Sequence, residues 1–600
     1  MLTIRNIAGA QIPDNLLYGF SGTINSSIQF ELFPIVEVQA VNDTPTVIGI
    51  NRTQDGSISV IKGPSIVYSL QKERITRKKH HWGRLGDIKN LYAGRLPYLD
   101  EPVDLVVECY SSDSEINKQE AYHQELKEVL TFCDKPQIVR VSHHLAHLYS
   151  AFYPSPFSQA AVMIIDCQGS PVKHFTEAWD GSAAADPDLL EVASFYRCER
   201  GRVECISKQL WDGDWSHPVG LGCFYYQLTR VIFPGEGNEG KVMGMAPFGQ
   251  PDALGLPPLI VENEQVFIPD EWLKMFQERE RFKFSGGTGS FEDCANLAAA
   301  GQQVFEDALL QVAGWLHEQT DMTSLCFAGG IALNCSANGR LRRESSFKDG
   351  VFIPPSPHDG GTALGSAMYG LVDRLGIQSD FRWVNDFLGP ESDDKAIEEL
   401  VATLPDDFIV EKPGNLINHI VELIDSGRVV GLYLGRSESG PRALGNRTIL
   451  ADPRHPNMQA FINQRVKGRE WFRPLAPIVL LDAASTFFDI DGPAPFMQFA
   501  ADVRPEYRSS LPAITHVDGT ARLQTVDEEN TPFLYALLKA FEAKTGYPIL
   551  LNTSLNGPGQ PLVESPQDAF ECLQATDMHA LAMLPYLIRK RAEPDLPDRS

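Results

Sequence analysis

The first half of the chain alternates between short apolar runs typical of strands and longer stretches with apolar residues at helical spacing. From residue 46, the run TVIGINRTQDGSISVIKGPSIVYSLQ predicts three strands, because its Asp-Gly and Lys-Gly pairs suit tight turns. Further strands are predicted at 104–111, 137–142 and 160–165, and helices at 116–132, 143–153 and 292–319. Strands that alternate with helices in this way indicate an α/β fold.

The second half returns to this alternation after a change in composition. Residues 386–412 contain Pro390 and the acidic run ESDDK, and the segment LPDDFIVEKPG (404–414) begins within them. Such segments are typical of a linker. Beyond it, a helix is predicted at 415–426 and a strand at 428–434. The sequence shows no low-complexity tract and no internal repeat. We predict four parts: an N-terminal extension (1–45) with strand candidates LLYGF and FELFPIVEV, a first domain (46–385), a linker (386–412) and a second α/β domain (413–600).

Composition and charge narrow the class of protein. Apolar residues make up 43% of the chain and charged residues 22%, as in soluble globular proteins. The net charge is -26, and an acidic surface repels polyanions, so we expect no nucleic-acid partner and no membrane partner. The ten cysteines form no CxxC pair, the N-terminus lacks a signal-peptide pattern, and no run of about 18 apolar residues occurs. These features predict a cytoplasmic protein with reduced thiols.

Three histidines in 141-VSHHLAHLYSAFYP-154 offer a candidate metal site. On a helix, His143 and His147 share a face, and His144 points about a hundred degrees away. Two imidazoles on one face can chelate a divalent ion, although such a pair on its own is more often structural. Asp166 ends a buried strand, and Asp359 lies in the strand-to-helix loop PHDGG. Together the four residues predict a metal centre, while a helix cap is the alternative for Asp359.

Three glycine-rich turns are candidate phosphate loops. They are DCQGS (166–170), GEGNEGKVMGMAPFG (235–249) and AGGIALN (328–334), and each leaves backbone amides free to face a phosphate. Ordinary loop geometry is the alternative for any one of them. Three in one α/β region resemble the nucleotide cleft of actin-like folds, in which two subdomains close on ATP. The candidate contacts are Gly169, Gly240, Lys241, Gly329, Gly330 and Asn334.

Cations gather in the second domain more densely than the acidic composition predicts. Charged residues in apolar strand-loop contexts need anionic partners. Internal salt bridges would satisfy some of them, and a phosphate pocket would satisfy more of them together. The cations are Arg442, Arg447, Arg465, Lys467, Arg469, Arg473 and Arg522, and the segment NTSLN adds Asn552, Ser554 and Asn556.

These motifs resemble those of the NodU/CmcH family of O-carbamoyltransferases. The matching segments occur in the family order and cover roughly residues 46–590. They are ERITRKKH, HHLAH, GKVMGMAPFG, GGIALNC, HDGGTALGSA, GPRALGNRTILADPR, KGREWFRPLAP, THVDGTARLQ and NTSLNGPGQPLV.

The resemblance implies an actin-like (ASKHA) first domain and a YrdC-like second domain. In such enzymes the YrdC-like part makes carbamoyl-adenylate from carbamoyl phosphate and ATP, and the first domain passes the carbamoyl group to an acceptor hydroxyl. The resemblance implies Fe2+ or a similar divalent ion at His143, His147, Asp166 and Asp359, Mg2+ with ATP, and Lys79 at the transfer site. The residues expected around carbamoyl phosphate and the adenylate are Arg442, Lys467, Arg473, Arg522, Asn552 and Ser554, of which Arg442, Lys467 and Arg522 are expected to be catalytic.

The chemistry agrees with these assignments. Carbamate is a poor electrophile, adenylation gives it a good leaving group, and cations must hold two anionic partners together. The acceptor hydroxyl needs a base, and Asp55 in the turn TQDGS is one candidate. The family usually has His-Asp where this chain has Gln54-Asp55, so the base is open. Two further departures are Asp166-Cys167 for Asp-Gly and Ser437-Glu438 for Met-Glu.

Three functions fit the sequence. The first is carbamoylation of a small molecule, expected to be a secondary metabolite such as an antibiotic. The second is carbamoyl or threonylcarbamoyl transfer to tRNA, which the acidic charge opposes. The third is a scaffold that has lost the chemistry. The sequence names neither the acceptor nor the oligomeric state, for which a homodimer is the candidate. Four tryptophans in less family-like segments suggest an apolar or aromatic acceptor: Trp179, Trp211, Trp215 and Trp272.

Overall fold

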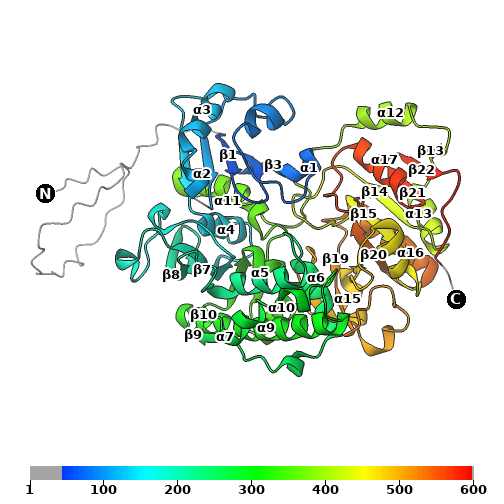
Figure 1. The fold of residues 1–600 in the computed structure, drawn as a ribbon. Coiled ribbons are helices and arrows are strands. Elements are labelled where there is room, and N and C mark those ends of the chain that lie inside the picture. Colours follow the sequence, from blue (N-terminus) through cyan, green and yellow to red (C-terminus); the bar gives the residue numbers. More distant parts are fainter. Residues whose placement is uncertain (1–43, 112, 598–600) are drawn as a thin grey trace, which may run out of the picture. The chain divides into compact units, whose positions relative to one another are not determined.

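The computed structural model describes residues 44–111 and 113–597, and the strand candidates near the N-terminus lie outside this range. The three strands predicted from residue 46 form an antiparallel meander, and two further strands extend it in parallel on the other side of β1. The resulting five-stranded sheet has the order β3-β2-β1-β4-β5 (Figure 1). Its strands are β1 (Thr46–Asn51), β2 (Ser57–Lys62), β3 (Ser65–Gln71), β4 (Leu105–Cys109) and β5 (Ile138–Val141).

A second five-stranded sheet follows the same plan. Its first three strands are an antiparallel meander, and its last two run parallel to β6, which gives the order β12-β11-β6-β7-β8. The two sheets therefore repeat one topology, although no repeat is evident in the sequence, because strand order depends on which strand edges pair and not on residue identity. The strands are β6 (Gln159–Ile165), β7 (Leu190–Glu199), β8 (Arg202–Trp211), β11 (Ser324–Ala328) and β12 (Gly350–Phe352).

Two buried helices separate these sheets, and the second of them is rich in small residues. α4 (His143–Ala151) packs on α11 (Thr362–Tyr369), α11 contacts β1, and α4 contacts β6 and β11 (Figure 1). The approach of α11 to α4 requires glycine, because a Cβ at Gly365 would lie 1.8 Å from the carbonyl oxygen of Ala146. The small residues of the GGTALGSA segment are thus explained by packing at the centre of the molecule.

The predicted long helix covers the outer side of the second sheet. α9 (Phe291–Thr320) has 30 residues and begins with a capping box between Ser290 and Asp293. It packs on α5 (Gly220–Ile232), α6 (Glu239–Met245) and β6. The predicted helix at 292–319 is confirmed.

The second half is built on an eight-stranded mixed sheet. Its order is β13-β22-β21-β14-β15-β20-β16-β19. β13 and α12 (Asp394–Ala402) lie within the segment expected to be a linker, and β13 pairs with β22, while the domain boundaries themselves stay a prediction. The strands are β13 (Phe408–Glu411), β14 (Val430–Tyr433), β15 (Arg447–Ala451), β16 (Ala476–Leu480), β19 (Gln524–Val526), β20 (Ile549–Ser554), β21 (Ala580–Met583) and β22 (Tyr586–Lys590), with α13 (Leu416–Asp425), α16 (Pro532–Thr545) and α17 (Pro566–Ala575) packed around them.

The segment ERITRKKH connects the two halves. It forms α1 (Lys72–Thr76) and the residues after it. Arg74 donates from Nη2 to the carbonyl oxygen of Gly440 at 2.5 Å, and Arg77 donates from Nη2 to that of Pro561 at 3.0 Å. Both carbonyls belong to loops of the second half, so these two hydrogen bonds attach the ERITRKKH segment to that half.

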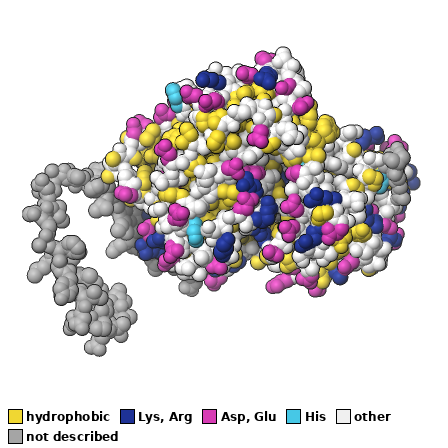
Figure 2. Space-filling model, turned by 90° about the horizontal axis from the view of Figure 1, so that it is seen from below, with side chains coloured by type: hydrophobic (Ala, Val, Ile, Leu, Met, Phe, Trp, Pro, Cys, Tyr) yellow, Lys and Arg dark blue, Asp and Glu magenta, His cyan; other side chains and the backbone are white. Residues whose placement is uncertain are grey.

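The predicted α/β class is confirmed by these three sheets and their helices. Within the described residues, no helix combines the length and apolar character needed to cross a membrane. On the face shown in Figure 2, acidic and basic side chains are intermixed and form no broad basic surface. That face therefore offers little to a polyanion.

Candidate metal centre and phosphate-binding site

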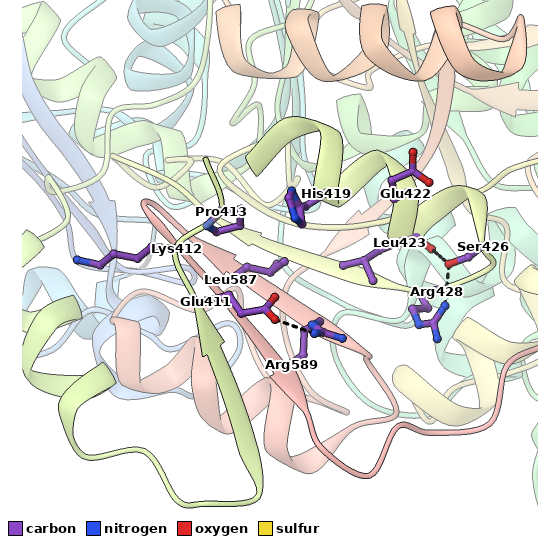
Figure 3. Close-up of a pocket in the computed structure, with 10 residues that line it drawn as sticks. All are labelled: Glu411, Lys412, Pro413, His419, Glu422, Leu423, Ser426, Arg428, Leu587 and Arg589. Carbon is purple, nitrogen blue, oxygen red and sulfur yellow. Dashed lines mark hydrogen bonds and ion pairs between the residues drawn. The ribbon is translucent and has the colours of Figure 1, made fainter. Parts of the chain in front are cut away.

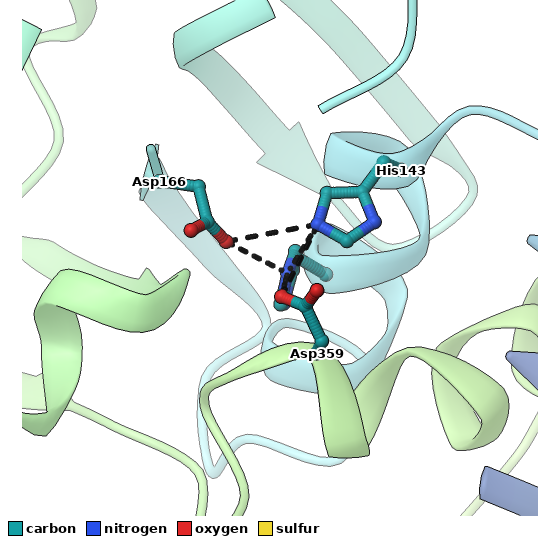
Figure 4. Close-up of side chains that lie close together, drawn as sticks. His143, Asp166 and Asp359 are labelled. Carbon is teal, nitrogen blue, oxygen red and sulfur yellow. Dashed lines mark hydrogen bonds and ion pairs between the residues drawn. The ribbon is translucent and has the colours of Figure 1, made fainter. Parts of the chain in front are cut away.

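The four predicted metal ligands converge at the first turn of α4 (Figure 4). The Nε2 atoms of His143 and His147 lie 3.2 Å apart. His143 Nε2 lies 3.6 Å from Asp166 Oδ2 and 3.4 Å from Asp359 Oδ1. His147 Nε2 lies 3.4 Å and 3.7 Å from the same two oxygens. One donor atom from each residue thus falls within 4.8 Å of all the others.

Local structure explains this convergence. His143 and His147 are one turn apart on α4, as their spacing predicts. Asp166 directly follows β6, and Asp359 follows β12, so both carboxylates leave the same edge of a parallel group of strands. The alternative for Asp359 was a helix cap, but no side chain caps the N-terminus of the 3-10 turn at Asp359–Gly361 or of α11. The carboxylate of Asp359 faces the imidazoles of His143 and His147 instead.

The donor set fits a divalent transition-metal ion. Burial alone would lower the pKa of His143, but Asp359 and Asp166 outweigh it and hold that pKa well above its usual range. Burial alone would raise the pKa of Asp166, yet hydrogen bonds from His143 and His147 hold it well below its usual range. Two buried carboxylates therefore stabilise positive charge between them, as they would around a cation. Imidazole and carboxylate donors together suit Fe2+ and its neighbours in the first transition series.

His144 turns away from the ligands and takes part in a buried network. Its Nδ1 lies 2.7 Å from Ser194 Oγ, and burial followed by Lys208 holds its pKa well below the usual range. Its backbone N–H donates to Glu191 Oε1 at 3.0 Å, and Lys208 Nζ donates to Glu191 Oε2 at 2.6 Å. Both side chains of this ion pair are fully buried. The pair thereby holds the first turn of α4, which carries His143.

Backbone amides of two predicted phosphate loops donate hydrogen bonds to other groups of the protein. The N–H of Gly169 donates to the carbonyl oxygen of Glu191 at 2.7 Å. The N–H of Gly330 donates to Asp166 Oδ2 at 3.2 Å, so this loop positions a metal ligand. Asn334 caps the helix that follows it. Direct contacts to a nucleotide stay a prediction for Gly169, Gly329, Gly330 and Asn334.

The third predicted loop reaches the second half of the chain. Lys241 Nζ lies 2.7 Å from Glu470 Oε1, and Arg473 Nη1 lies 3.8 Å from Glu470 Oε2. Gly240 precedes Lys241 on α6 and is exposed. Glu470 thus joins a lysine of the first half to an arginine of the predicted pocket, and a nucleotide contact from Gly240 or Lys241 stays a prediction.

A group of like charges, the cation cluster, lies where the two halves meet. Burial, followed by Arg522, lowers the pKa of Arg442 to about 9. Burial, followed by Arg473 and Arg522, lowers the pKa of Arg469 to about 9 as well. The Nε atoms of Arg442 and Arg522 are buried without a hydrogen-bond partner. The cluster consists of six cations that act on one another: Lys79, Arg442, Lys467, Arg469, Arg473 and Arg522.

Lys467 is surrounded by neutral oxygens. Its Nζ donates to the carbonyl oxygen of Ser554 at 2.8 Å, to Ser554 Oγ at 3.2 Å and to the carbonyl oxygen of Asn556 at 3.0 Å. Burial, followed by Arg469 and then by Lys79 and Arg473, holds the pKa of Lys467 well below its usual range. The structure therefore brings Lys467 and Ser554 together, as the resemblance implies, and adds Asn556.

Three other polar residues from these motifs have partners outside the cluster. Asn552 is 1% exposed and is hydrogen-bonded within the second half, so its contact with a ligand stays a prediction. Arg447 is fully buried and lies over the ring of Tyr433, 3.7 Å from its centroid. Arg465 is exposed and pairs with Asp577 at 2.5 Å. These motifs therefore contain more cations than the cation cluster does.

Asp55 lies beside the metal centre and has an unexpected partner. The Nδ2 of Asn51 donates to the carbonyl oxygens of Asp55 at 3.2 Å and of Asp359 at 3.0 Å. Asp55 Oδ1 lies 2.9 Å from the Nδ1 of His80. The sequence did not point to His80 as a site residue, and it offered Arg469 and Asn556 only as members of a larger group for a phosphate pocket. All three lie within quoted motifs, but only the fold brings His80 to Asp55 or separates Arg469 from Arg465.

A pocket of about 530 Å3 lies on the second half and contains none of these residues (Figure 3). The strong charges at its wall are paired, Arg589 with Glu411 at 2.9 Å and Arg428 with Glu593 at 2.6 Å. A mixed and internally satisfied lining favours no ligand of one charge. This pocket is therefore not part of the candidate site.

Both halves of the chain match models of a known protein family. Residues 111–368 match the model "Carbamoyltransferase N-terminus", and residues 421–590 match "Carbamoyltransferase C-terminus". Nodulation protein U of Sinorhizobium fredii is 35% identical over 88% of this chain and 96% of its own length. Nodulation protein NolNO of the same species is 34% identical over 77% of this chain, which spans 65% of that protein. A structure of full-length HypF in the phosphate- and nucleotide-bound form covers 57% of this chain and 48% of its own, at 12% identity and a TM-score of 0.34.

Proposed function

The chain belongs to the carbamoyltransferase family, and we propose that it is an ATP-dependent O-carbamoyltransferase. In this proposal carbamoyl phosphate and ATP give carbamoyl-adenylate at the cation cluster. The carbamoyl group then passes to a hydroxyl of a small molecule beside the metal centre. The net charge of -26 supports a small-molecule acceptor, for which a secondary metabolite is our proposal, over tRNA.

The cation cluster is the observation that carries this proposal. Arg442, Arg469 and Lys467 each have a lowered pKa, so the folded protein holds positive charges that are buried and repel one another. Such an arrangement is unfavourable without an anion. The phosphates of ATP and carbamoyl phosphate carry the charge that would balance it, and Arg442 and Arg522 have Nε donors that still lack an acceptor.

The residues of the cluster have separable roles in the proposed first reaction. Arg442 and Arg522 would hold the phosphates through their open guanidinium donors and neutralise charge in the transition state. Lys467, whose Nζ is already fixed by Ser554 and Asn556, would present one positive charge without having to be ordered first. Lys79 enters the cluster from the first half and would contact the group that is handed on.

The metal centre serves the second reaction. An ion held by His143, His147, Asp166 and Asp359 would supply Lewis-acid charge to the phosphate of the leaving AMP. Glu191 and Lys208 hold the helix that bears the histidines, and Gly330 holds Asp166, so the ligands are oriented before any ion binds. A labile adenylate is best kept from water, which favours both sites within one chain.

Carbamoyl phosphate-dependent exchange between ATP and pyrophosphate tests the first reaction. We expect exchange in the wild type and a loss of at least 100-fold in Arg442→Gln, since removal of a single oxyanion donor costs about 10²–10³ in rate. Arg465→Gln is the matched control, because Arg465 comes from the same motifs but is exposed and paired with Asp577. Absence of exchange in the wild type would refute the proposal.

Mass spectrometry with a panel of hydroxylated natural products tests the second reaction. Transfer replaces one hydrogen by a carbamoyl group, a gain of roughly 43 mass units on the acceptor. The gain is expected only when ATP and carbamoyl phosphate are both present. A gain on tRNA and on no small molecule would overturn the proposed acceptor class and leave carbamoyl transfer standing.

A further inference from the structure

His80 and Asp55 form a pair at the edge of the metal centre. Their Nδ1 and Oδ1 atoms are 2.9 Å apart, although the residues are 25 positions apart in the chain. The side chain of His80 is 35% exposed, while that of Asp55 is 7% exposed. An incoming molecule therefore meets the imidazole, and the carboxylate lies behind it.

The pair is fixed relative to the metal ligand Asp359. Asn51 Nδ2 donates to the backbone carbonyls of both Asp55 and Asp359. His358, the residue before Asp359, has its Nε2 3.8 Å from Asp55 Oδ2. Asp55, and with it the imidazole of His80, is thus held in place relative to the turn that bears Asp359.

Backbone geometry shows that the pair is held in an unusual conformation. Asp55 has φ 50° and His80 has φ 53°, both in the left-handed region, which costs roughly 1–2 kcal/mol for an L-residue. The loop at Gly237 passes over the other side of the ring, where a Cβ on Gly237 would lie 2.4 Å from His80 Nε2. Strain of this kind is kept at functional sites, and position 237 leaves space beside His80 Nε2 only because glycine has no Cβ.

Resting on the proposed function, we propose that His80 is the proton acceptor for the acceptor hydroxyl and that Asp55 is its positioning residue. As the hydroxyl oxygen bonds to the carbamoyl carbon, its proton passes to His80 Nε2. The bond from that carbon to the adenylate phosphate oxygen breaks, and the electron pair leaves with AMP. Asp55 accepts from Nδ1–H and balances the imidazolium that forms.

The charges around His80 set how its reactivity depends on pH. The groups that act on it are Asp55, Glu73, Lys79, Glu239 and His358. The hydrogen bond with Asp55 outweighs burial and raises the pKa of His80 to about 9. The neutral ring is then about one in a hundred at pH 7, so transfer to a hydroxyl should rise with pH up to about 9.

Two nucleophiles that differ in their need for a base test the proposal. Glycerol must lose a proton on attack, whereas hydroxylamine attacks as a neutral amine and traps carbamoyl-adenylate without assistance. In His80→Gln we expect carbamoylation of glycerol to fall by about 10²–10⁴-fold and hydroxylamine trapping to stay within twofold of wild type. His81→Gln is the matched control, because the neighbouring His81 lies against Thr76 Oγ1 and not against Asp55. It should leave both reactions unchanged.

The pH profile separates a base from a residue that only shapes the loop. The rise toward pH 9 should disappear in His80→Gln and move toward the ordinary histidine range in Asp55→Asn. The proposal is overturned if His80→Gln keeps the glycerol reaction, or if it loses both reactions together. Loss of ATP–pyrophosphate exchange in the wild type would instead refute the proposed function, while normal exchange in His80→Gln shows that the variant is folded.

Discussion

Arg469 offers a direct measure of the electrostatic cost of the cation cluster. Burial first, and then Arg473 and Arg522, lower its pKa from the ordinary arginine range to about 9. For a base, a lowered folded-state pKa means that the protonated form destabilises the fold. The full penalty is present below pH 9 and disappears as pH rises from about 9 into the ordinary arginine range, so at pH 7.5 the protein carries all of it.

The size of the penalty follows from that shift. A change of roughly 3.5 pKa units corresponds to about 5 kcal/mol, and partial solvent screening of Arg469 reduces it to about half. Arg469→Gln also loses the hydrogen bond from Arg469 Nε to Asn463 Oδ1, 2.8 Å long, which contributes about 1 kcal/mol. We therefore expect Arg469→Gln to stabilise the ligand-free protein by about 1–2 kcal/mol and to abolish exchange activity.

Urea denaturation at pH 7.5 and low salt measures this effect. Because a chain of 600 residues does not unfold in one two-state step, the comparison is the shift in midpoint between variants under identical conditions. Arg469→Gln should raise the midpoint, and Arg465→Gln, an exposed residue of the same segment, should leave it unchanged. Adding pyrophosphate should stabilise the wild type more than Arg469→Gln. A lower midpoint for Arg469→Gln, or equal stabilisation by pyrophosphate, refutes the reasoning.

Three other features allow direct tests. Lys208→Met leaves the buried Glu191 without its closest cation and should destabilise the protein by about 3–5 kcal/mol in urea. His147→Ala should abolish binding of Fe2+ or Mn2+, measured by elemental analysis after dialysis, whereas His419→Ala, an exposed histidine, should not. Burial raises the pKa of Asp386 to about 7, so folding takes up a proton there and stability should fall as pH rises from about 4 to 7. Asp386→Asn should flatten that part of the pH dependence.

Periodicity predicted the elements that bury a continuous face. α9 runs from Phe291 to Thr320, within one residue of the prediction, and β1 to β3 follow the predicted meander. Apolar spacing records which side of an element is buried, and a long helix or a hairpin needs little more. The shared order of the two five-stranded sheets could not be predicted, because strand order depends on which edges pair and no side-chain pattern states that.

The candidate site was predictable to the extent that one element carries it. His143 and His147 lie on a single helix, so spacing alone put them on one face. The pairing of His80 with Asp55 is different, because each residue comes from a turn with φ above zero and neither turn has a periodic pattern. Arg469 and Arg465 lie in the same sequence segment, yet Arg469 is in the cluster and Arg465 pairs with Asp577. The sequence does not distinguish them, because the fold determines which cations are buried.

The segment ERITRKKH gives the proposed two-step reaction its geometry. Arg74 and Arg77 attach it to carbonyls of the second half, Lys79 enters the cation cluster, and His80 meets Asp55 beside the metal centre. The adjacent residues Lys79 and His80 therefore serve the two proposed reactions. Because they share one backbone segment, the two sites cannot move apart unless that segment moves. A carbamoyl group made at the cluster would then pass along this segment to the acceptor and stay out of bulk water, which is the condition a labile adenylate requires.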